Sequence, residues 1–341
     1  MIRSKVYFFV SASNPFNSIR IQIDLISNLL RDLFHVETEI IHPGIKNYAN
    51  TLKRVISNDE ILFWHYGGLD FHLNILSKNK NITYVYHNIT PSFFFWKTEP
   101  LVSIRSILGK IQLNLISKKK KWITMSDYNV SELKSIGFKN VFLCPNIISK
   151  NTNQRLPKTE EISLLYVGRI APNKNCIFLL DQVEKVANKL LVPISLVVIG
   201  SAKEGCRYGK SFREKFKSLM SHEYLKINWK EKIDENQLNE LYQQSWLYLS
   251  TSLHEGFGVP VCESIANGTP ALYLKCGGQE SVLENVGLVS DQNIFDFIVT
   301  DLIINAAKRK ELLKKQIEIV SKFCKPEINK IVYEVYEKNI S

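Results

Sequence analysis

The stretch LYLSTSLHEGFGVPVCES, residues 247–264, contains a short apolar strand pattern, a glycine-containing turn and the start of a helix. Gly256 and Gly258 let backbone amides approach a ligand closely, because glycine has no Cβ. Pro260 suits the start of a helix, where a missing N–H costs nothing, and Gly268 is a favoured residue at which to stop one. The stretch therefore predicts a strand, a loop and a helix whose amino end faces a ligand.

Short apolar runs and longer helical patterns alternate along the whole chain. The predicted strands span residues 6–10, 61–64, 83–86, 122–125, 141–143, 163–167, 195–199, 225–228, 247–250 and 271–274. Residues 19–33 and 69–76 are two of the helical patterns that follow them. This alternation is typical of parallel α/β architecture.

The chain length indicates more than one domain. At 341 residues it exceeds what one hydrophobic core usually supports. The polar stretch SKNTNQRLPK, residues 149–158, separates two series of strands and is the predicted linker. We therefore expect an α/β fold with two Rossmann-like, doubly wound domains, residues 1–150 and residues 151–341.

Two carboxylates lie on either side of the glycine turn. Glu255 precedes it in the loop, and Glu263 lies one turn into the predicted helix. An ionised carboxylate accepts hydrogen bonds, so the two residues can bind two different polyols. Open parallel sheets bind ligands at the carboxyl ends of their strands, and the strands that end at Val167, Ile199 and Ser250 lead into the candidate segments. The expected active site is a cleft between the domains.

Three segments carry a resemblance to a known family. Glu255 and Glu263, with two glycines and a proline between them, resemble the donor-site motif of the retaining glycosyltransferases of family 4. Residues 166–175, YVGRIAPNKN, are similar to that family's strand, Gly-Arg turn and downstream lysine. Residues 86–91, YHNITP, are similar to the histidine segment of many bacterial members, whereas residues 1–80 match only in general pattern.

The resemblance implies the GT-B fold, in which two Rossmann-like domains face a cleft. It implies that the first domain binds the acceptor and that the second binds the nucleotide sugar. The last helix of such proteins commonly crosses back to the first domain, and residues 326–339 fit that helix.

The resemblance also implies roles for single residues. Arg169 and Lys174 would clamp the donor diphosphate and stabilise the negative charge that grows on the leaving phosphate. Glu263 would hold the ribose hydroxyls, and Glu255 would contact the transferred sugar. His87, just after a predicted strand, would contact the sugar or support the reacting face.

These roles define two sets of candidate site residues. The catalytic set is His87, Arg169, Lys174 and Glu255. The set that binds the nucleotide sugar is Gly168, Arg169, Lys174, Gly256, Phe257, Gly258, Val259 and Glu263. Gly256, Phe257 and Gly258 would contribute backbone amides, and Val259 would fill space beside the nucleotide.

Several of these assignments have a structural alternative. The alternative for Arg169 and Lys174 is an ordinary surface position, and for Glu263 it is a helix cap. His65 also follows a strand pattern, and it either lines the acceptor side or has a structural role. The first turn, from Ser11 to Asn14, departs from the Gly-Gly pair of many family members, so contact between its amides and phosphate stays open.

No metal cofactor is expected. The sequence has no Asp-x-Asp segment near the candidate site and no His and Cys cluster with the spacing of metal ligands. Six cysteines without a Cys-x-x-Cys pair indicate free thiols in a reducing cytosol. The apolar run at residues 6–10 is too short for a signal peptide, and no run is long enough to span a membrane.

Positive charge is concentrated in the first half of the chain. Of the net charge of +11, residues 1–150 carry +9 and residues 151–341 carry +2. Residues 104–117 predict a helix with apolar residues at 104, 107, 108, 111 and 115, and four lysines follow at 118–121. Such a helix fits an anionic membrane surface, and the alternative is a core-packed helix that ends in a solvated lysine run. Nucleic acid is not an expected partner, because aromatic residues are not interleaved with these lysines.

Taken together, the motifs predict a hexosyltransferase that takes a sugar from a nucleoside diphosphate sugar and keeps the anomeric configuration. The basic first half favours a lipid-linked glycan acceptor, a peripheral position on the cytoplasmic face of the membrane, and surface polysaccharide synthesis of the O-antigen or capsule type. One alternative is a sugar phosphorylase of the same fold. An alternative from another class is a basic protein that binds RNA or anionic surfaces without catalysis.

Overall fold

The computed structural model describes residues 5–11, 18–149 and 158–340. Most of the predicted linker and of the turn from Ser11 to Asn14 lies outside the described residues. The chain divides into two compact units, each described here by itself. Unit 1 comprises the described residues of Met1–Pro91, Ile104–Ile147 and Lys325–Ser341. Unit 2 comprises those of Ser92–Ser103 and Ile148–Cys324.

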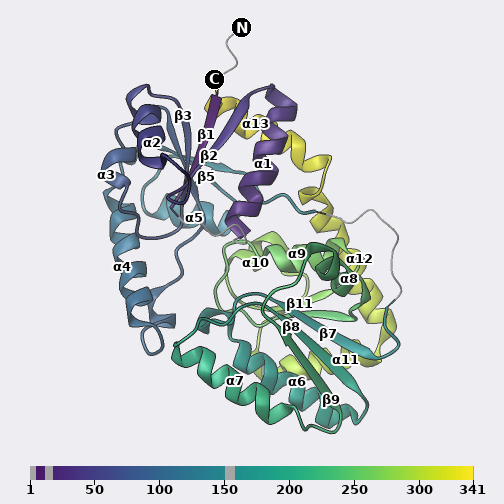
Figure 1. Ribbon diagram of the computed structural model, residues 1–341. Helices are drawn as coiled ribbons and strands as arrows, with labels where there is room; N and C mark the ends of the chain where they lie inside the picture. The colour runs from purple at the N-terminus through teal and green to yellow at the C-terminus, as the bar shows by residue number, and fades with distance from the viewer. Residues whose placement is uncertain (1–4, 12–17, 150–157, 341) are drawn as a thin grey trace. The chain divides into compact units, whose positions relative to one another are not determined.

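Unit 1 is built on a parallel sheet of six strands (Figure 1). The strands are β1 (Lys5–Val10), β2 (Glu37–Ile41), β3 (Ile61–Tyr66), β4 (Ile82–Tyr86), β5 (Lys121–Thr124) and β6 (Asn140–Leu143). Their order in the sheet is β2-β1-β3-β4-β5-β6. The chain therefore changes direction along the sheet between β1 and β3, the kind of switch point at which open α/β sheets bind ligands.

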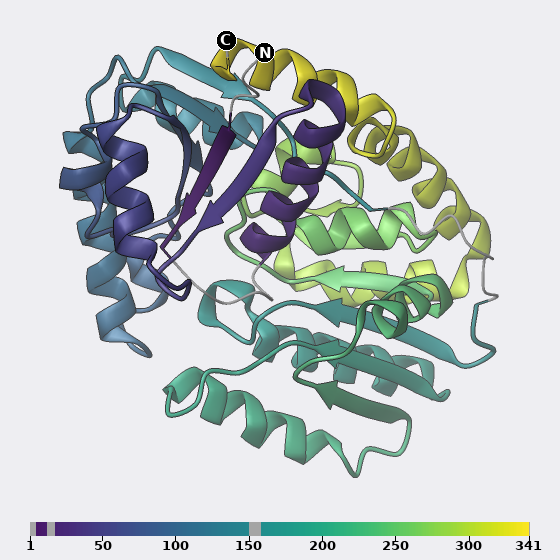
Figure 2. The same ribbon diagram turned by 45° about the horizontal axis from the view of Figure 1, so that its top comes forward.

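Helices cover both faces of this sheet. They are α1 (Ser18–Phe34), α2 (Tyr48–Ser57), α3 (Leu73–Leu76), α4 (Pro100–Leu115), α5 (Asp127–Ser135) and α13 (Glu327–Ile340). The first residues of α4, up to Ser103, belong to unit 2. One face packs against α1 and α13, which lie side by side in Figure 2. The other face packs against α2, α3, α4 and α5. Strand residues alternate between the two cores, as Phe8 and Phe9 do, so the inner strands β1, β3 and β4 are buried on both sides.

Helix α13 completes the core of unit 1 although it follows unit 2 in the sequence. The Tyr336 ring lies 4.8 Å from the Phe63 ring between centroids, and Tyr333 stacks on Phe34 of α1 at 4.9 Å. Ile328 and Val332 are fully buried in the same cluster. The helix predicted at residues 326–339 thus exists within one residue of its predicted ends.

Unit 2 contains the second parallel six-stranded sheet, in the order β12-β11-β10-β7-β8-β9. Its strands are β7 (Ile162–Val167), β8 (Ile194–Ile199), β9 (Leu225–Lys230), β10 (Leu247–Ser250), β11 (Ala271–Leu274) and β12 (Leu288–Val289). Its helices are α6 (Cys176–Leu190), α7 (Arg207–Leu219), α8 (Glu235–Gln244), α9 (Val259–Ala266), α10 (Gly278–Val282), α11 (Phe295–Ile304) and α12 (Ala306–Val320). The described residues of this unit also include the 3₁₀ turns η1 (Ser92–Phe94), η2 (Pro172–Lys174), η3 (Gln292–Ile294) and η4 (Ser321–Phe323).

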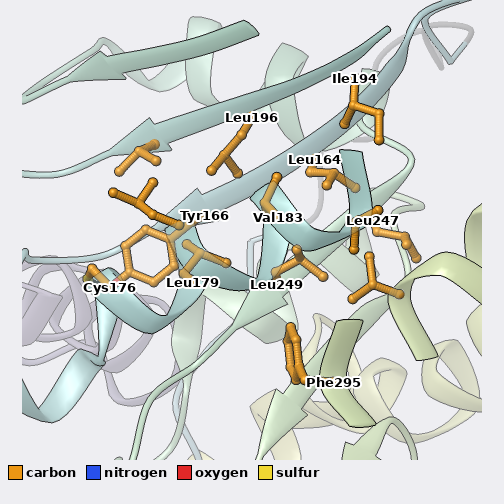
Figure 3. Packing of buried hydrophobic residues seen from close by; sticks show 14 of the residues in the cluster. Leu164, Tyr166, Cys176, Leu179, Val183, Ile194, Leu196, Leu247, Leu249 and Phe295 are labelled. Carbon is orange, nitrogen blue, oxygen red and sulfur yellow. Dashed lines mark hydrogen bonds between the residues drawn. The ribbon is translucent and has the colours of Figure 1, made fainter. Parts of the chain in front are cut away.

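Figure 3 shows the main core of unit 2 at close range. Leu164 and Leu196 from neighbouring strands belong to one cluster with Val183 of α6 and Phe295 of α11, and all four side chains are fully buried. Removing such side chains from water stabilises a fold by about 1.5–3 kcal/mol each. This packing holds β7 and the start of α6 in place. The candidate cations Arg169 and Lys174 lie in the segment that connects these two elements.

The predicted α/β fold with two doubly wound sheets is confirmed. Two strands were missed: β12 has only two residues, and β2 reads ETEII, whose two glutamates hide the strand pattern. The helix predicted at residues 69–76 is reduced to the four residues of α3. The reason is Asp70, whose carboxylate accepts hydrogen bonds from Trp64 Nε1 at 2.9 Å and from the His72 backbone amide at 2.9 Å, and so holds residues before α3 in a turn.

Candidate active site

The candidate donor residues lie at the switch point of unit 2. β7 and β10 are neighbours in the sheet, and the strands that follow them in sequence lie on opposite sides. The loops after these two strands therefore separate and leave room for a ligand outside the carboxyl ends of the strands. Gly168 and Arg169 follow β7, and the segment from Thr251 to Gly258 follows β10.

Close backbone approaches fix both loops. A Cβ added to Gly200 would lie 2.0 Å from the carbonyl oxygen of Gly168, and the Gly168 amide donates to Ile199 at 2.8 Å. On the other side, a Cβ on Gly278 would lie 2.3 Å from the carbonyl carbon of Gly256. The loops after β7 and β10 are thus held against their neighbours at distances that only glycine permits.

Lys174 and Glu255, which lie in the segments after β7 and β10, form an ion pair. Both side chains are 16% exposed, so the pair is largely shielded from water but still reachable. Ser252 Oγ also donates to Glu255 Oε1 at 2.9 Å, and Thr251 Oγ1 donates to the Lys174 carbonyl at 3.1 Å. The structure therefore brings together one predicted cation and one predicted carboxylate, and it links the turn η2 to the loop after β10.

Arg169 is exposed, and its guanidinium has neither an ion pair nor a hydrogen bond among the described residues. Its backbone is held, because Tyr166 Oη donates to the Arg169 carbonyl at 3.2 Å. A fixed backbone with an unpaired guanidinium suits an anion that arrives from solution, since Arg binds phosphate through two parallel N–H groups.

Gly258 caps the amino end of α9 with a φ of +93°, a conformation that favours glycine. The helix begins at Val259, so Pro260 is its second residue and not its first as predicted. It ends at Ala266, and Gly268 follows with a φ of +89°, as the sequence predicts. The Phe257 side chain is buried against the Phe323 ring at 5.5 Å, which leaves its backbone as the part that can meet a ligand.

Glu263 lies on α9 with its carboxylate next to Tyr242 of α8. Tyr242 Oη donates to Glu263 Oε2 at 3.0 Å. Burial raises the pKa of the Glu263 carboxyl to about 7, although the hydrogen bond from Tyr242 acts in the opposite direction. The sequence did not indicate Tyr242, because its helix has an ordinary amphipathic pattern and nothing marks this tyrosine among its neighbours.

His87 belongs to unit 1, where it directly follows β4. Its backbone amide donates to the Tyr66 carbonyl at 2.9 Å and so extends the pairing of β4 with β3. Its Nε2 lies 2.7 Å from Nδ1 of His65, the last residue but one of β3. His65 is only 4% exposed, so it has the structural position that the sequence left as an alternative.

A comparison with protein families decides the identity of the chain. Residues 148–321, just over half of the sequence, match the family model described as glycosyl transferases group 1. The chain belongs to the group 1 glycosyl transferases. The family and the class of enzyme predicted from the three motifs are thereby confirmed. The roles predicted for single residues of this glycosyl transferase stay predictions.

Curated relatives match this glycosyl transferase only in part. A putative glycosyltransferase 48 of Sulfolobus islandicus filamentous virus (isolate Iceland/Hveragerdi) is 48% identical over 42 residues, which are 12% of this chain and 14% of the viral protein. The GtfA subunit of the Streptococcus agalactiae UDP-N-acetylglucosamine–peptide N-acetylglucosaminyltransferase is 26% identical over 143 residues, 40% of this chain. The matched part spans about a quarter of that subunit's length (26%).

Solved structures resemble this glycosyl transferase over almost its whole length and share its GT-B fold. Sucrose-phosphate synthase from Thermosynechococcus elongatus has a TM-score of 0.76 at 14% identity, with 98% of this chain and 99% of that one covered. HepE of Anabaena, in complex with UDP and glucose, has a TM-score of 0.73 at 14% identity and the same coverage. WaaG, a glycosyltransferase involved in lipopolysaccharide biosynthesis, has a TM-score of 0.69 at 13% identity, again with 98% and 99% covered.

Within the described residues, no helix of this glycosyl transferase is both long and apolar enough to cross a membrane.

Proposed function

We propose that this glycosyl transferase moves a hexose-like sugar from a nucleoside diphosphate sugar to a hydroxyl of a glycan acceptor, with retention of the anomeric configuration. The observation that carries the proposal is the arrangement after β7 and β10. There an exposed arginine, a paired lysine and glutamate, and a second, half-buried glutamate lie around the carboxyl ends of two neighbouring strands. Cationic side chains bind phosphate, and carboxylates accept hydrogen bonds from the hydroxyls of the sugar and the ribose.

Arg169 and Lys174 would bind the diphosphate. When the bond between the sugar and the donor phosphate breaks, negative charge grows on the leaving phosphate, and fixed cations stabilise that charge. Lys174 is held by Glu255 in the described structure, so donor binding would redirect its ammonium group toward phosphate. Glu255 would then accept hydrogen bonds from hydroxyls of the transferred sugar.

The backbone after β10 would contribute to the same binding site. Gly168, Gly256, Phe257 and Gly258 would bring main-chain atoms close to the donor, and the amino end of α9 favours negative charge. Val259, the first residue of that helix, would pack beside the nucleotide.

Glu263 would bind the ribose. Hydroxyl groups donate hydrogen bonds to an ionised carboxylate, so ribose binding favours the charged form of this residue. Tyr242 holds one carboxylate oxygen and leaves the other to the ligand. His87 would contact the transferred sugar or support its reacting face, and no nucleophilic side chain takes part in the proposal, which rests on positioning and charge stabilisation.

A uridine diphosphate sugar is the first donor to test. The name of the streptococcal relative contains UDP-N-acetylglucosamine, and HepE is described in complex with UDP and glucose. Those names describe the other proteins, and they guide only the order of testing here. The prediction that no metal cofactor is required is kept.

Helix α4 supports the proposed membrane contact. The apolar residues that the sequence placed on one side of it are Ile104, Ile107, Leu108, Ile111 and Leu115, and they are 40% to 75% exposed. Gly109 and Leu113 on the opposite side are buried, so α4 turns its apolar face outward and packs with the other. An exposed apolar face of this kind fits the boundary region of a lipid layer.

The neighbourhood of α4 extends that face. A Cβ on Gly109 would lie 2.7 Å from the Leu69 amide nitrogen, so the helix packs directly on the segment before α3. Phe71, two residues further on, is 83% exposed. Figure 1 shows α3 and α4 next to each other in unit 1. We propose that this surface brings the enzyme to the cytoplasmic face of an anionic membrane as a peripheral protein, to act on a lipid-linked glycan in surface polysaccharide synthesis of the O-antigen or capsule type.

The lysine run contributes less to this surface than the sequence suggests. Lys118 lies over the Phe138 ring at 4.3 Å and also donates to a backbone carbonyl, and Lys121 donates to the Lys338 carbonyl at 3.1 Å. Lys120 likewise donates to the Asn79 carbonyl at 3.3 Å. Their charges remain near the surface, but the side chains are partly occupied within the protein.

Thermal unfolding with UDP, GDP, ADP and CMP tests the donor site. A ligand at 100 times its dissociation constant adds about 2.7 kcal/mol to the free energy of unfolding. We expect one nucleoside diphosphate to stabilise the protein and Glu263→Ala to abolish the effect, whereas Glu240→Ala, on the exposed side of α8, leaves it unchanged. No stabilisation by any nucleotide, together with sugar release that depends on inorganic phosphate, would replace the proposal with a phosphorylase.

A further inference from the structure

His65 and His87 form a coupled pair at the carboxyl ends of two neighbouring strands of unit 1. Their strands pair in parallel, with Tyr66 of β3 opposite Tyr86 of β4. The ring centroids lie 4.9 Å apart with an angle of 23° between the planes, and Nδ1 of His65 lies 2.7 Å from Nε2 of His87. The ring of His87 is therefore fixed in position by both stacking and a hydrogen bond.

The hydrogen bond restricts the protonation of both rings. At this distance one nitrogen must donate and the other accept, so a single proton lies between Nδ1 of His65 and Nε2 of His87. Burial lowers the pKa of His87 to about 3 and lowers the pKa of His65 well below its usual range, with the neighbouring His87 as a second cause. Both rings are thus neutral at physiological pH, and the bond couples their tautomers: either both rings carry hydrogen on Nδ1 or both carry it on Nε2.

His65 also lines a small cavity. Its Nε2 is buried and has no hydrogen-bond partner among the described residues. The cavity, of about 10 Å³, is also lined by Tyr336 of α13, whose buried hydroxyl has no partner among them either. Gln22 of α1 lines it too, but both ends of its amide are bonded to the backbone of Ile147, at 2.9 and 3.0 Å.

His65 and Tyr336 line the same small cavity, and each has a buried polar atom without a hydrogen bond among the described residues, so one small molecule could bond to both. A buried polar atom without a hydrogen bond has lost its contacts with water and gained none in exchange, which is unfavourable. A cavity of about 10–15 Å³ is the smallest that holds one water molecule, which bonds to two to four polar groups. The geometry points to a single water bonded to both His65 Nε2 and the Tyr336 hydroxyl.

We propose that His65 is a positioning residue for His87, and that His65 is itself held through a buried water by Tyr336 of α13. The proposal rests on the proposed function, because it gives His87 its place beside the transferred sugar. His65 does not touch the donor in this scheme. It acts by holding the His87 ring in one orientation and one tautomer. A sugar oxygen then always contacts His87 Nδ1 in the same protonation state.

Nitrogen NMR of the full chain tests the pair without any substrate. With ¹⁵N-labelled histidine, correlation of ring nitrogens and ring protons separates nitrogens that carry hydrogen from those that do not. We expect a single tautomer for His65 and for His87 in the unchanged protein. His65→Phe should bring the His87 signals to values averaged between tautomers, whereas His65→Asn, which keeps a polar group near the Nδ1 position, should retain one form.

Tyr336→Phe tests the link to α13, and Tyr333→Phe on the same helix is its matched control. Tyr333 is 39% exposed and donates to Glu337, outside the cavity. We expect Tyr336→Phe to shift the His65 Nε2 signal and Tyr333→Phe to leave it in place. Because Tyr336→Phe removes only one oxygen, it keeps the test open if His65→Phe fails to fold.

Transfer kinetics give the second measurement. A misplacement of about 1 Å near the reacting atoms costs on the order of 100-fold in rate, so we expect His65→Phe to lower kcat by about 10- to 100-fold with little change in donor KM. His65→Asn should restore part of the loss. The proposal is overturned if His65→Phe leaves the His87 signals as they are, or if it changes those signals while kcat stays the same.

The two proposals can fail separately. If no donor supports transfer by the unchanged protein, the proposed function fails, whatever the histidine spectra show. If transfer proceeds but His87 carries hydrogen on both ring nitrogens at neutral pH, the proposed function stands and the neutral histidine pair is wrong.

Discussion

The ammonium group of Lys174 pairs with the Glu255 carboxylate across 81 positions of sequence. The pair joins the turn before α6 to the loop after β10, and both partners are mostly shielded from water. The Glu255 carboxylate holds the lysine side chain at the edge of the sheet before the donor arrives, and donor binding would exchange this partner of the ammonium group for phosphate.

Lys174→Ala should therefore reduce kcat strongly. Loss of one fixed group that stabilises developing charge costs about 10²–10³ in kcat. Lys226→Ala is the matched control, because Lys226 pairs with Glu161 on the surface at 3.2 Å and follows the start of β9. Steady-state transfer rates measure both, and a Lys174→Ala enzyme with normal turnover contradicts the diphosphate clamp.

Glu263 should make stability depend on pH. Its folded pKa of about 7 lies above the usual value of 4.5, so the folded state binds the proton more tightly than the unfolded state does. Its contribution to the free energy of unfolding is therefore greatest at low pH and falls as pH rises from about 4.5 to about 7. Glu263→Gln removes this dependence.

Urea unfolding at pH 5 and pH 8 measures the effect. Relative to the unchanged protein, Glu263→Gln should be more stable at pH 8 than at pH 5, by on the order of 3 kcal/mol for a pKa shift of this size. Glu240→Gln on the exposed side of α8 should show no such difference. Equal effects of Glu263→Gln at the two pH values would mean that the carboxyl ionises normally.

Gly258→Ala should destabilise the protein more than Gly268→Ala, although both glycines flank α9 at a similar positive φ. A left-handed conformation costs an L-residue about 1–2 kcal/mol at either position. At Gly258 the new Cβ would also lie 2.5 Å from Gln279 Cγ, whereas nothing lies within 4 Å of it at Gly268. Urea unfolding compares the two, and nucleotide stabilisation should be lost only in Gly258→Ala.

Ile107→Ser with Ile111→Ser should weaken binding to vesicles that contain anionic lipid. Each isoleucine gains about 1.5–3 kcal/mol when fully removed from water, so the double change should reduce binding by about tenfold or more. Met220→Ser, at a residue 68% exposed beyond the end of α7, is the control. Flotation with vesicles measures binding, and an unchanged affinity would refute membrane contact through α4.

Charge reversal of lysines 118–121 should have a smaller effect that disappears at high salt, because three of these side chains already have partners within the protein. The same flotation assay at low and high salt separates the apolar contribution from the electrostatic one.

Chelation of divalent metal ions should leave the transfer rate unchanged. Arg169 and Lys174 supply the positive charge that the leaving phosphate needs in the proposed reaction. The measurement is transfer in the presence of excess EDTA, with and without added Mg²⁺ or Mn²⁺. Activity that is lost with EDTA and recovered with either ion would show that a metal is required.

The fold could be predicted from the sequence where strands are buried on both faces. Runs such as residues 163–167 and 247–250 are almost entirely apolar, because helices cover both sides of the sheet. The strand β2 was missed because it lies at the edge of its sheet, where glutamates remain in contact with water. Helix α4 was recognised, but only the exposure of its isoleucines decides between a core position and an outward face.

The candidate site could be predicted only as separate segments. Lys174 and Glu255 were both named, but nothing in the spacing of 81 residues indicates that they pair. Tyr242 had no distinctive pattern, and His65 was noted only as a histidine at the end of a strand pattern, because a hydrogen bond between two elements leaves no periodic pattern in the sequence of either one. Side chains that hold other side chains are therefore the part of this site that only the structure reveals.

The place of α13 has a consequence for synthesis on the ribosome. The first sheet is complete once β6 has left the exit tunnel, but the helix that covers Phe63 and its neighbours comes after the whole of unit 2. At about 5–20 residues per second, roughly 10–40 seconds separate the two. During that time one apolar face of the nascent first unit is only partly covered, which makes it a natural binding surface for a chaperone until the last helix arrives.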